Sequence, residues 1–194
     1  MSKGEATRQR IVEAAAPLFN QHGFAGCSMQ HVMEATGLEK GGLYRHFASK
    51  EELAAESFSY ALGLAMQSRS AGVEKVEGTV AKLHYLVDRF VSTPGPVAGG
   101  CPLLNTAIDS DDGNATLRGL ARNGIKSWKS RLELIAEEGK RTGQIRSEVE
   151  ASVVANTIVA MLEGALMVSR IEGNREALRD AGATLNGLID GYAS

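Results

Sequence analysis

The chain has few of the residues that build disulfide-linked or cysteine-rich metal sites, because only two cysteines occur among its 194 residues. Two cysteines cannot form a disulfide scaffold or a four-cysteine zinc site, so the composition favours a reducing cytoplasm. Long apolar runs are also missing. The longest, residues 158–168, is interrupted by Glu163, whereas a helix that crosses a membrane needs about 18 apolar residues. We therefore expect no transmembrane helix and, because residues 1–10 are polar, no signal peptide.

Aromatic residues make up only 5% of the chain, and the formal net charge is −2. With 43% hydrophobic residues, this composition is typical of a soluble globular protein. The charge is uneven, because residues 1–50 hold six basic and four acidic side chains and the remainder holds 15 and 19. A positive segment favours the approach of a polyanion, although a balance of +2 is common in other proteins too.

Apolar residues recur at the helical period along almost the whole chain, and no segment alternates as a strand does. Glycines at 23 and 37 are expected to end the first two helices, and residues 93–102 have the composition of a loop. A short helix is expected over residues 40–46, with Leu43 and Phe47 in the core. The pattern predicts an all-α fold of about nine helices. An N-terminal three-helix helix-turn-helix head (residues 1–48) precedes a larger helical effector-binding and dimerisation domain (residues 49–194).

Several polar residues stand where helices are expected to begin. Their side chains accept hydrogen bonds from the free N–H groups of the first helical turn. A glutamate three residues later completes a capping box. The predicted caps are Ser28, the pairs Ser49/Glu52 and Ser147/Glu150, and Asn174.

Three short helices within 50 residues, the second and third joined by a glycine-containing turn, indicate a helix-turn-helix. The segment contains Thr7-Arg8-x-x-Ile11, Ala14-Ala15-x-x-Leu18-Phe19, Gly23-Phe24, Ser28-Met29-x-x-Val32, Ala35-x-Gly37-Leu38 and Lys40-Gly41-Gly42-Leu43-Tyr44-Arg45-His46-Phe47-x-Ser49-Lys50-Glu51-Glu52-Leu53. In these motifs it resembles the TetR family of bacterial transcriptional regulators. The resemblance covers about the first quarter of the chain and implies that the helix at 40–46 enters the major groove of DNA.

Each residue type near this helix suits contact with DNA. Tyr44 and His46 carry groups that donate to phosphate oxygens, and Lys50 adds a positive charge where a helix N-terminus already favours an anion. Lys40 and Arg45 are the candidates to contact base edges, while glycines at 41 and 42 let the backbone come close. The predicted DNA-binding residues are Ser28, Lys40, Gly41, Gly42, Tyr44, Arg45, His46 and Lys50.

Some nearby residues leave alternatives open. Glu39 departs from the commoner serine of the family, and its carboxylate either caps the helix or repels phosphate and selects a cytosine amino group. Lys3 and Arg8 belong either to an arm in the minor groove or to a disordered tail. His22 and His31 are expected to have no functional role.

The last two predicted helices favour a dimer. The final helix carries apolar residues at steps of three and four, and the preceding helix is apolar nearly all round, so it needs partners on two sides. One partner is its own domain and the other is the same helix pair in a second subunit; the alternative is packing within one domain. The predicted interface residues are Val154, Ile158, Leu162, Leu178, Ala181, Leu185, Leu188 and Tyr192. The TetR resemblance implies a dimer independently, and a dimer requires a palindromic operator.

The resemblance also implies that helices between residues 54 and 171 hold a small molecule. The sequence shows no cluster of like charge there, which favours a mostly apolar effector. The candidate pocket residues, each of which is also suited to an ordinary core, are Phe58, Leu62, Met66, Phe90, Cys101, Asn105, Trp128 and Met161. Residues 100–107 look like a segment found in one subset of TetR regulators, but they do not name a ligand.

The function predicted from the sequence is a dimeric, ligand-responsive DNA-binding regulator in the cytoplasm, most simply a repressor that an effector releases from its operator. An activator of the same fold, a helical adaptor and an enzyme are the alternatives. Cys101 has no histidine near it in sequence, and His84 with Asp88 makes only two of the ligands that a metal needs. No glycine motif for nucleotide binding occurs, so we expect no catalytic site, metal, cofactor or membrane partner.

Overall fold

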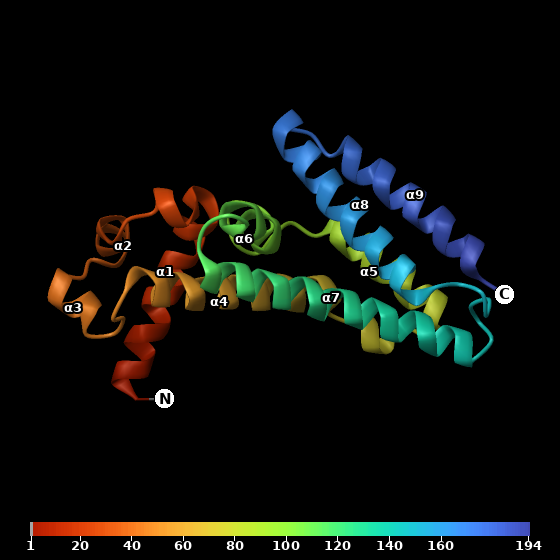
Figure 1. Ribbon diagram of the computed structural model, residues 1–194, viewed down its shortest axis with the longest axis horizontal. Helices are drawn as coiled ribbons and strands as arrows, with labels where there is room; N and C mark the ends of the chain where they lie inside the picture. The colour runs from red at the N-terminus through yellow and green to blue at the C-terminus, as the bar shows by residue number, and fades with distance from the viewer. Residues whose placement is uncertain (1) are drawn as a thin grey trace. The chain divides into compact units, whose positions relative to one another are not determined.

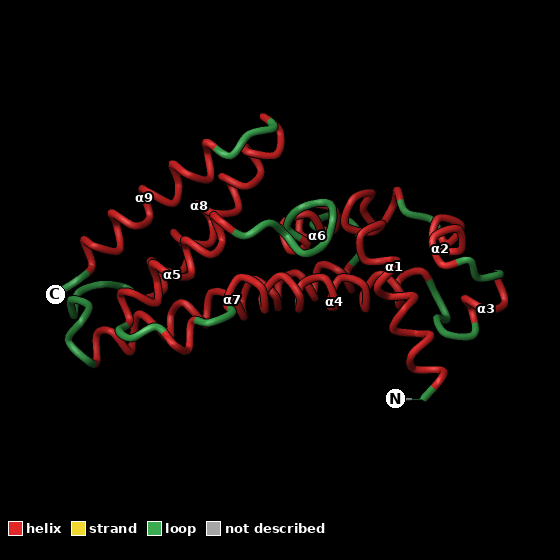
Figure 2. Tube along the Cα trace, turned by 180° about the vertical axis from the view of Figure 1, so that it is seen from behind, coloured by secondary structure: helices red, strands yellow, loops and turns green. Residues whose placement is uncertain are grey.

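The computed structural model describes residues 2–194, which form nine α-helices and one short 3-10 helix (Figure 1). The elements are α1 (Lys3–Gly26), α2 (Met29–Thr36), α3 (Lys40–Tyr44), α4 (Lys50–Ser70), η1 (Val73–Lys75), α5 (Thr79–Ser92), α6 (Pro102–Ser110), α7 (Ala115–Arg141), α8 (Ala151–Glu172) and α9 (Glu176–Tyr192). Figure 2 shows helices and loops and no strand, and in this part of the chain the only β-type pairing is an isolated bridge between Ile145 and Ala193. The prediction of an all-α fold is therefore confirmed.

The chain divides into two compact units. The N-terminal unit comprises the chain up to Met66 together with Gly95–Gly124, and the C-terminal unit comprises Gln67–Pro94 together with Ile125–Ser194. The helices α4 and α7 therefore each contribute to both units. The predicted boundary at residues 48/49 divides the DNA-binding head from the effector-binding domain, and this functional division stays a prediction.

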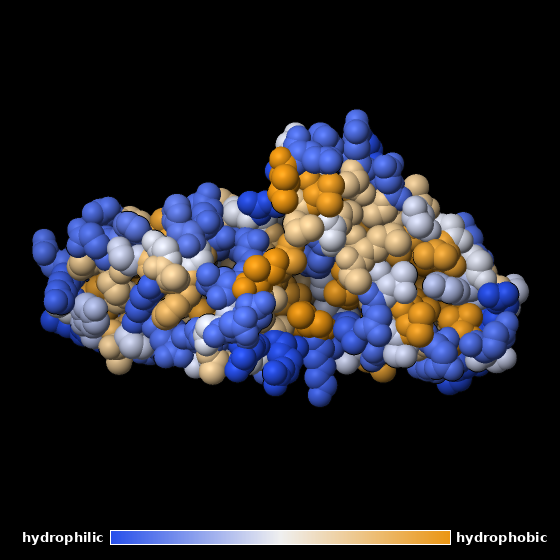
Figure 3. Space-filling model, turned by 45° about the horizontal axis from the view of Figure 1, so that its top comes forward, coloured by the Kyte–Doolittle hydropathy of each residue, from blue (hydrophilic) through white to orange (hydrophobic). Residues whose placement is uncertain are grey.

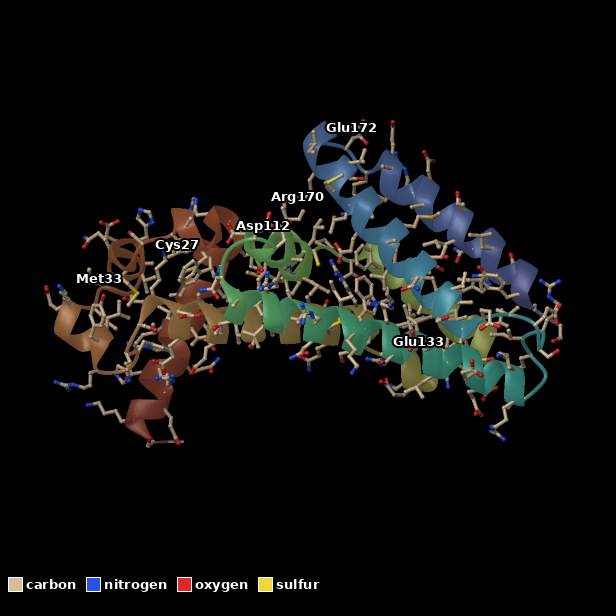
Figure 4. The ribbon with its side chains drawn as sticks, viewed as in Figure 1. Cys27, Met33, Asp112, Glu133, Arg170 and Glu172 are labelled. Atoms are coloured by element: carbon tan, nitrogen blue, oxygen red, sulfur yellow. The ribbon has the colours of Figure 1, made fainter. Side chains whose placement is uncertain are left out.

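The core of the N-terminal unit is a cluster contributed by α1, α2, α3 and α4. Cys27 and Met33 point into the space among the first three helices (Figure 4). Leu43 and Phe47 are fully buried there, as predicted. The buried members are Ile11, Val12, Ala15, Cys27, Val32, Leu43, Phe47 and Leu53. Burial raises the pKa of the Cys27 thiol, so this cysteine is protonated at neutral pH and acts as a packing residue.

Helix α1 is kinked at Gly23, which has a positive φ of 71°, so this glycine interrupts the helix and does not end it. The kink frees the N–H of Phe24, which donates to Oδ2 of Asp109 on α6 at 2.7 Å. Close by, the Asn105 side chain donates to the carbonyl oxygen of Asn20 at 2.9 Å and to that of Gly99 at 2.8 Å. These polar contacts hold α6 against α1.

The core of the C-terminal unit is formed by α5, the second half of α7, α8 and α9. Within it, the rings of Phe90 and Trp128 stack with their centroids 5.5 Å apart. By length and composition α8 is the one helix among residues 2–194 that is apolar enough to cross a membrane. The expectation drawn from the length of uninterrupted apolar runs was therefore too strict. The single buried Glu163 does not lower the mean hydropathy of α8 below that of a helix that could cross a membrane.

The predicted helix starts were right in part. Ser28 caps α2, and Ser49 Oγ accepts from the Glu52 N–H at 3.1 Å, although the Glu52 carboxylate bonds to the Ala48 N–H and not to Ser49. Asn174 Oδ1 accepts from the Glu176 N–H at 2.8 Å at the start of α9.

The capping box predicted at Ser147 and Glu150 is wrong, because α8 begins at Ala151 and its N-cap, Glu150, makes no side-chain capping bond. The preceding segment is held elsewhere: the N–H of Arg146 donates to the carbonyl of Tyr192 at 3.0 Å. This long-range pairing with the end of the chain fixes the approach to α8, and no local pattern records it.

Candidate nucleic-acid interface

The α2–turn–α3 segment has the geometry of a helix-turn-helix. Ser28 Oγ accepts from the His31 N–H at 3.2 Å, and His31 Nδ1 accepts from the Ser28 N–H at 3.2 Å, so α2 begins with a complete capping box. Gly37 ends α2 in the left-handed conformation (φ 68°), which glycine adopts at little cost. His31 therefore has a structural role that the sequence analysis did not assign.

Helix α3 presents one face to solvent and is anchored by the other. Leu43 is fully buried, whereas Lys40, Gly41 and Arg45 are exposed. Tyr44 is 43% exposed, and the Lys40 ammonium lies 6.0 Å from the centre of its ring. The exposed residues of this segment thus supply two positive charges, from Lys40 and Arg45, and the hydroxyl group of Tyr44. At Gly41 no side chain covers the backbone.

Glu39 occupies the N-cap position of α3, but its side chain makes no capping hydrogen bond. The capping hypothesis for this residue is therefore wrong. Of the two hypotheses drawn from the sequence, the one in which the exposed carboxylate faces DNA stays open.

The α3–α4 connection carries the other predicted phosphate contacts. Lys50 is the first residue of α4, as predicted, and its ammonium lies 4.4 Å from the centre of the Phe24 ring. His46 is half-buried in the turn. Lys50 therefore stands at a helix N-terminus whose first N–H groups favour an anion, and His46 lies in the turn that precedes it.

Arg8 belongs to neither an arm nor a disordered tail, so both sequence hypotheses for it are wrong. Helix α1 begins at Lys3 behind a capping box of Ser2 and Glu5. The Arg8 guanidinium bonds to Glu52 and Glu56 of α4 and to the carbonyl of His46. Glu52 and Glu56 are four residues apart in the sequence and therefore share one face of α4, and this pair of carboxylates was the signal available for a cation opposite them.

The ion pair is intact at neutral pH. Hydrogen bonds from Arg8, and secondly from the Ala48 N–H, hold the pKa of the Glu52 carboxyl below its usual value. Hydrogen bonds to Glu56 and Glu52 raise the pKa of Arg8. Because the folded pKa of Glu52 is lowered, its stabilising effect is present at neutral pH and is lost as the pH falls through that lowered pKa.

The predicted effector residues fall into both units. Phe58, Leu62, Met66, Cys101 and Asn105 belong to the N-terminal unit, and Phe90, Trp128 and Met161 to the C-terminal unit. Asn105 already uses its amide to hold α6 against α1. Beside Phe90 lies Arg69, only 7% exposed, with its guanidinium carbon 3.8 Å from the ring centre. A charge is thus buried next to one predicted pocket residue, which the sequence analysis missed.

Most of the predicted dimer residues are buried inside the protomer. Their seam of period 3.5 packs α9 on α5 and α8 within the protomer, and its contact with a partner subunit stays a prediction. The residues buried in this way are Val154, Ile158, Leu162, Leu178, Ala181 and Leu185. Of the predicted set, Leu188 is exposed and Tyr192 is half-buried.

A different apolar surface remains on α8 and α9. Apolar atoms gather next to the α8–α9 turn (Figure 3). We use the name outer α8–α9 face for the exposed apolar residues of these two helices, which are Val153, Met167, Val168, Ile171 and Leu188.

The side chains of His84 and Asp88 both contact residues of α9. His84 contacts Oδ1 of Asn186 at 2.8 Å and Oδ1 of Asp190 at 2.9 Å, and Asp88 accepts from the Asn186 side chain at 2.9 Å. These contacts join α5 to α9. No group of three or more metal-ligating side chains occurs among residues 2–194.

Comparison with known proteins identifies the class to which this helix-turn-helix belongs. Residues 11–56 match the family described as "Bacterial regulatory proteins, tetR family", and residues 79–185 match "Tetracyclin repressor-like, C-terminal domain". The regulator LmrA of Bacillus subtilis is 30% identical over 97% of this chain and 99% of its own length. The repressor DhaR of a Mycobacterium strain is 26% identical over 88% of this chain and 86% of its own.

A solved TetR regulator from Chloroflexus aurantiacus is similar in structure as well as in sequence. It has a TM-score of 0.94 and 42% identity, covering 100% of this chain and 98% of that one. The chain is therefore a helix-turn-helix transcriptional regulator. It belongs to the TetR family of bacterial regulatory proteins.

Proposed function

We propose that this protein is a cytoplasmic, dimeric repressor. It binds a palindromic operator through α3 and the α3–α4 turn, and a small molecule releases it from the DNA. The observation that carries the proposal is α3 itself, a helix anchored by buried Leu43 whose Lys40, Gly41, Tyr44 and Arg45 face outward. An anchored helix with an exposed cationic face fits the major groove. DhaR, a relative described as a repressor, supports the sign of regulation.

Individual roles follow from the chemistry of each side chain. Lys40 and Arg45 contact base edges, and Tyr44, His46 and Lys50 contact phosphates. Ser28 contributes to DNA binding through its position at the N-terminus of α2, where its hydroxyl group caps the helix. The glycines at 41 and 42 allow the backbone to approach the duplex.

The dimer and the effector are the remaining parts of the proposal. We place the interface on the outer α8–α9 face, because exposed apolar side chains that gather in one patch mark an interaction surface. The effector we propose is a small, mostly apolar molecule. A structural neighbour from Saccharomonospora viridis, 21% identical, was solved in complex with choline, which supports a small-molecule site in this fold.

The proposal is tested by asking the protein to select its own site from a pool of 30-base-pair duplexes of random sequence. We expect an inverted repeat whose half-sites lie about 34–36 Å apart, one turn of DNA. Failure to enrich any duplex would contradict the proposed function. The enriched sequence, referred to below as the selected duplex, then serves as the probe for every variant.

The same selection tests the base-contacting residues. Lys40→Ala and Arg45→Ala are each expected to relax the preference at particular positions of the half-site, at a cost of about 1–3 kcal/mol for the preferred base. Sequencing of the enriched pools measures this preference. An unchanged sequence preference would remove that residue from the base-contacting set.

Lys50→Ala tests the phosphate contact. We expect weaker binding to all sequences, and a slope of log K against log salt that is smaller by about 0.9, because one fewer counterion is released. Fluorescence anisotropy over a range of salt concentrations gives this slope. Lys126→Ala, which removes the same charge from the exposed surface of α7, is the control and should leave the slope unchanged. Equal slopes for Lys50→Ala and the parent would place Lys50 away from phosphate.

Gly41→Leu is a substitution that should weaken DNA binding without lowering the stability of the fold. A Cβ at residue 41 would meet no atom within 4 Å, and leucine favours a helix over glycine by up to about 1 kcal/mol. The free energy of unfolding should therefore stay the same or rise slightly. Binding to the selected duplex should weaken at least tenfold, about 1.4 kcal/mol, because the new side chain occupies the space of the groove wall. Undiminished binding would show that the backbone at Gly41 does not approach DNA.

A further inference from the structure

Arg8 joins three parts of the N-terminal unit. It lies on α1, two of its partners lie on α4, and its third partner is the turn that follows α3. Its Nη2 lies 2.6 Å from Glu52 Oε1, and its Nε donates to Glu56 Oε2 at 3.1 Å. Its Nη1 donates to the carbonyl oxygen of His46. The guanidinium carbon also lies over the Phe47 ring, 4.0 Å from its centre.

The same contacts continue into the backbone of the turn. The second carboxylate oxygen of Glu52 accepts from the Ala48 N–H at 2.7 Å. The backbone of the turn is therefore held at two points. Arg8 bonds to the carbonyl oxygen of His46, and Glu52, which is itself bonded to Arg8, accepts from the N–H of Ala48. We call this arrangement the Arg8 clamp: the side chains of Arg8, Glu52 and Glu56 with the backbone groups of His46 and Ala48.

The clamp engages every nitrogen of the guanidinium. Nε, Nη1 and Nη2 each donate to an acceptor within the protein. The geometry of an arginine fork is rigid, so these bonds fix the direction of the side chain. Arg8 is thus committed to internal acceptors and is not placed to serve as a phosphate ligand.

The clamped turn is the segment on which the phosphate contacts depend. It lies between Tyr44 and Lys50 and includes His46. A displacement of about 1 Å is enough to misplace hydrogen-bond donors at a binding site. The conformation of residues 46–49 therefore decides whether these three side chains meet the sugar-phosphate backbone together.

We propose that Arg8 is a positioning residue for DNA binding, one that holds the α3–α4 turn in the conformation in which its side chains grip phosphate. The inference rests on the proposed function. It assigns Arg8 an effect on affinity without a contact to DNA.

A purely electrostatic role makes the opposite prediction for the glutamates. If Arg8 only neutralised two carboxylates near the polyanion, removing a carboxylate would strengthen DNA binding, because the local charge would become more positive. If the clamp positions the turn, removing a carboxylate that holds Arg8 weakens binding despite the more positive charge. The sign of the change therefore distinguishes the two roles.

The experiment compares Glu56→Gln with Glu51→Gln, which removes the same charge from the same end of α4 but involves a residue outside the clamp. Binding to the selected duplex is measured over a range of salt concentrations, with thermal unfolding as a check of the fold. Glu56→Gln should bind about threefold to tenfold more weakly than Glu51→Gln, in line with the loss of a charged hydrogen bond. Arg8→Gln should bind at least about tenfold more weakly than the parent with the same salt slope.

Three results would overturn the inference. Glu56→Gln that binds as tightly as Glu51→Gln would show that the clamp does not position the turn. A salt slope smaller by about 0.9 in Arg8→Gln would make Arg8 a phosphate contact instead. If the parent protein selects no duplex, the proposed function is overturned together with this inference. If the parent binds its duplex and the variants bind it with unchanged affinity, this inference alone is overturned. If Arg8→Gln does not fold, the comparison of the two glutamate variants decides.

Discussion

Replacing Met167 and Ile171 together by glutamate is expected to convert a dimer into a monomer and to weaken binding to the selected duplex by about 10²–10⁴-fold. Ile171 is 80% exposed on the outer α8–α9 face, and Met167 lies one helical turn before it. Four carboxylates brought together at a two-fold apolar interface are desolvated and repel one another, which prevents association. A single head then loses the gain in effective concentration that linkage to a second head provides.

Sedimentation measures the oligomeric state and anisotropy measures binding. The control is Leu134→Glu, because Leu134 is apolar and 72% exposed on α7 but lies outside the outer α8–α9 face. It should leave both dimer and binding intact. A dimer that persists in the double variant would move the interface to another surface. A charge at Leu185 is not a substitute, since that residue is buried in the protomer and its replacement would unfold the C-terminal unit.

Phe47→Ala is expected to destabilise the N-terminal unit by about 3–5 kcal/mol, the cost of a large aromatic side chain removed from a core. Phe47 is fully buried among α1, α2, α3 and α4 and carries the Arg8 guanidinium on its ring. The loss exceeds half the stability of many single domains, so binding to the selected duplex should disappear with the fold. Urea denaturation followed by circular dichroism measures the change.

Tyr44→Ala is the matched control for this prediction. Tyr44 is an aromatic residue three positions earlier, but it lies on the exposed face of α3. Its replacement should change the free energy of unfolding by no more than about 0.5 kcal/mol and still weaken DNA binding. If the two variants lost stability equally, the assignment of one residue to the core and the other to the interface would be wrong.

The helices and the DNA-binding segment were predictable from the sequence because both depend on local signals. Leu43 and Phe47 stand four residues apart and are both buried, although α3 ends at Tyr44 and not at the predicted residue 46, and Gly37 marks the left-handed end of α2. The family resemblance then assigned roles to the residues between them. Capping at Ser28 followed from its position alone.

The errors concern side chains whose partners lie far away in the sequence. Arg8 looked like part of a loose basic arm, but carboxylates on α4 hold it in place. Leu185 and Ile158 form an apolar seam that suits either a partner subunit or the protomer's own core, and periodicity does not distinguish the two. The start of α8 is set by a bond between Arg146 and the chain end. Such contacts are fixed by the tertiary structure and leave little trace in local pattern.

The most direct test of the account is amide hydrogen exchange of the full-length protein, measured with and without the selected duplex. Contact with DNA excludes solvent from the N–H groups nearest to it and slows local opening, so we predict slower exchange across residues 40–50 when the duplex is bound. Exchange in this segment that is identical with and without bound duplex, accompanied by protection on α5 to α9 alone, would contradict the claim that α3 and the turn after it grip DNA.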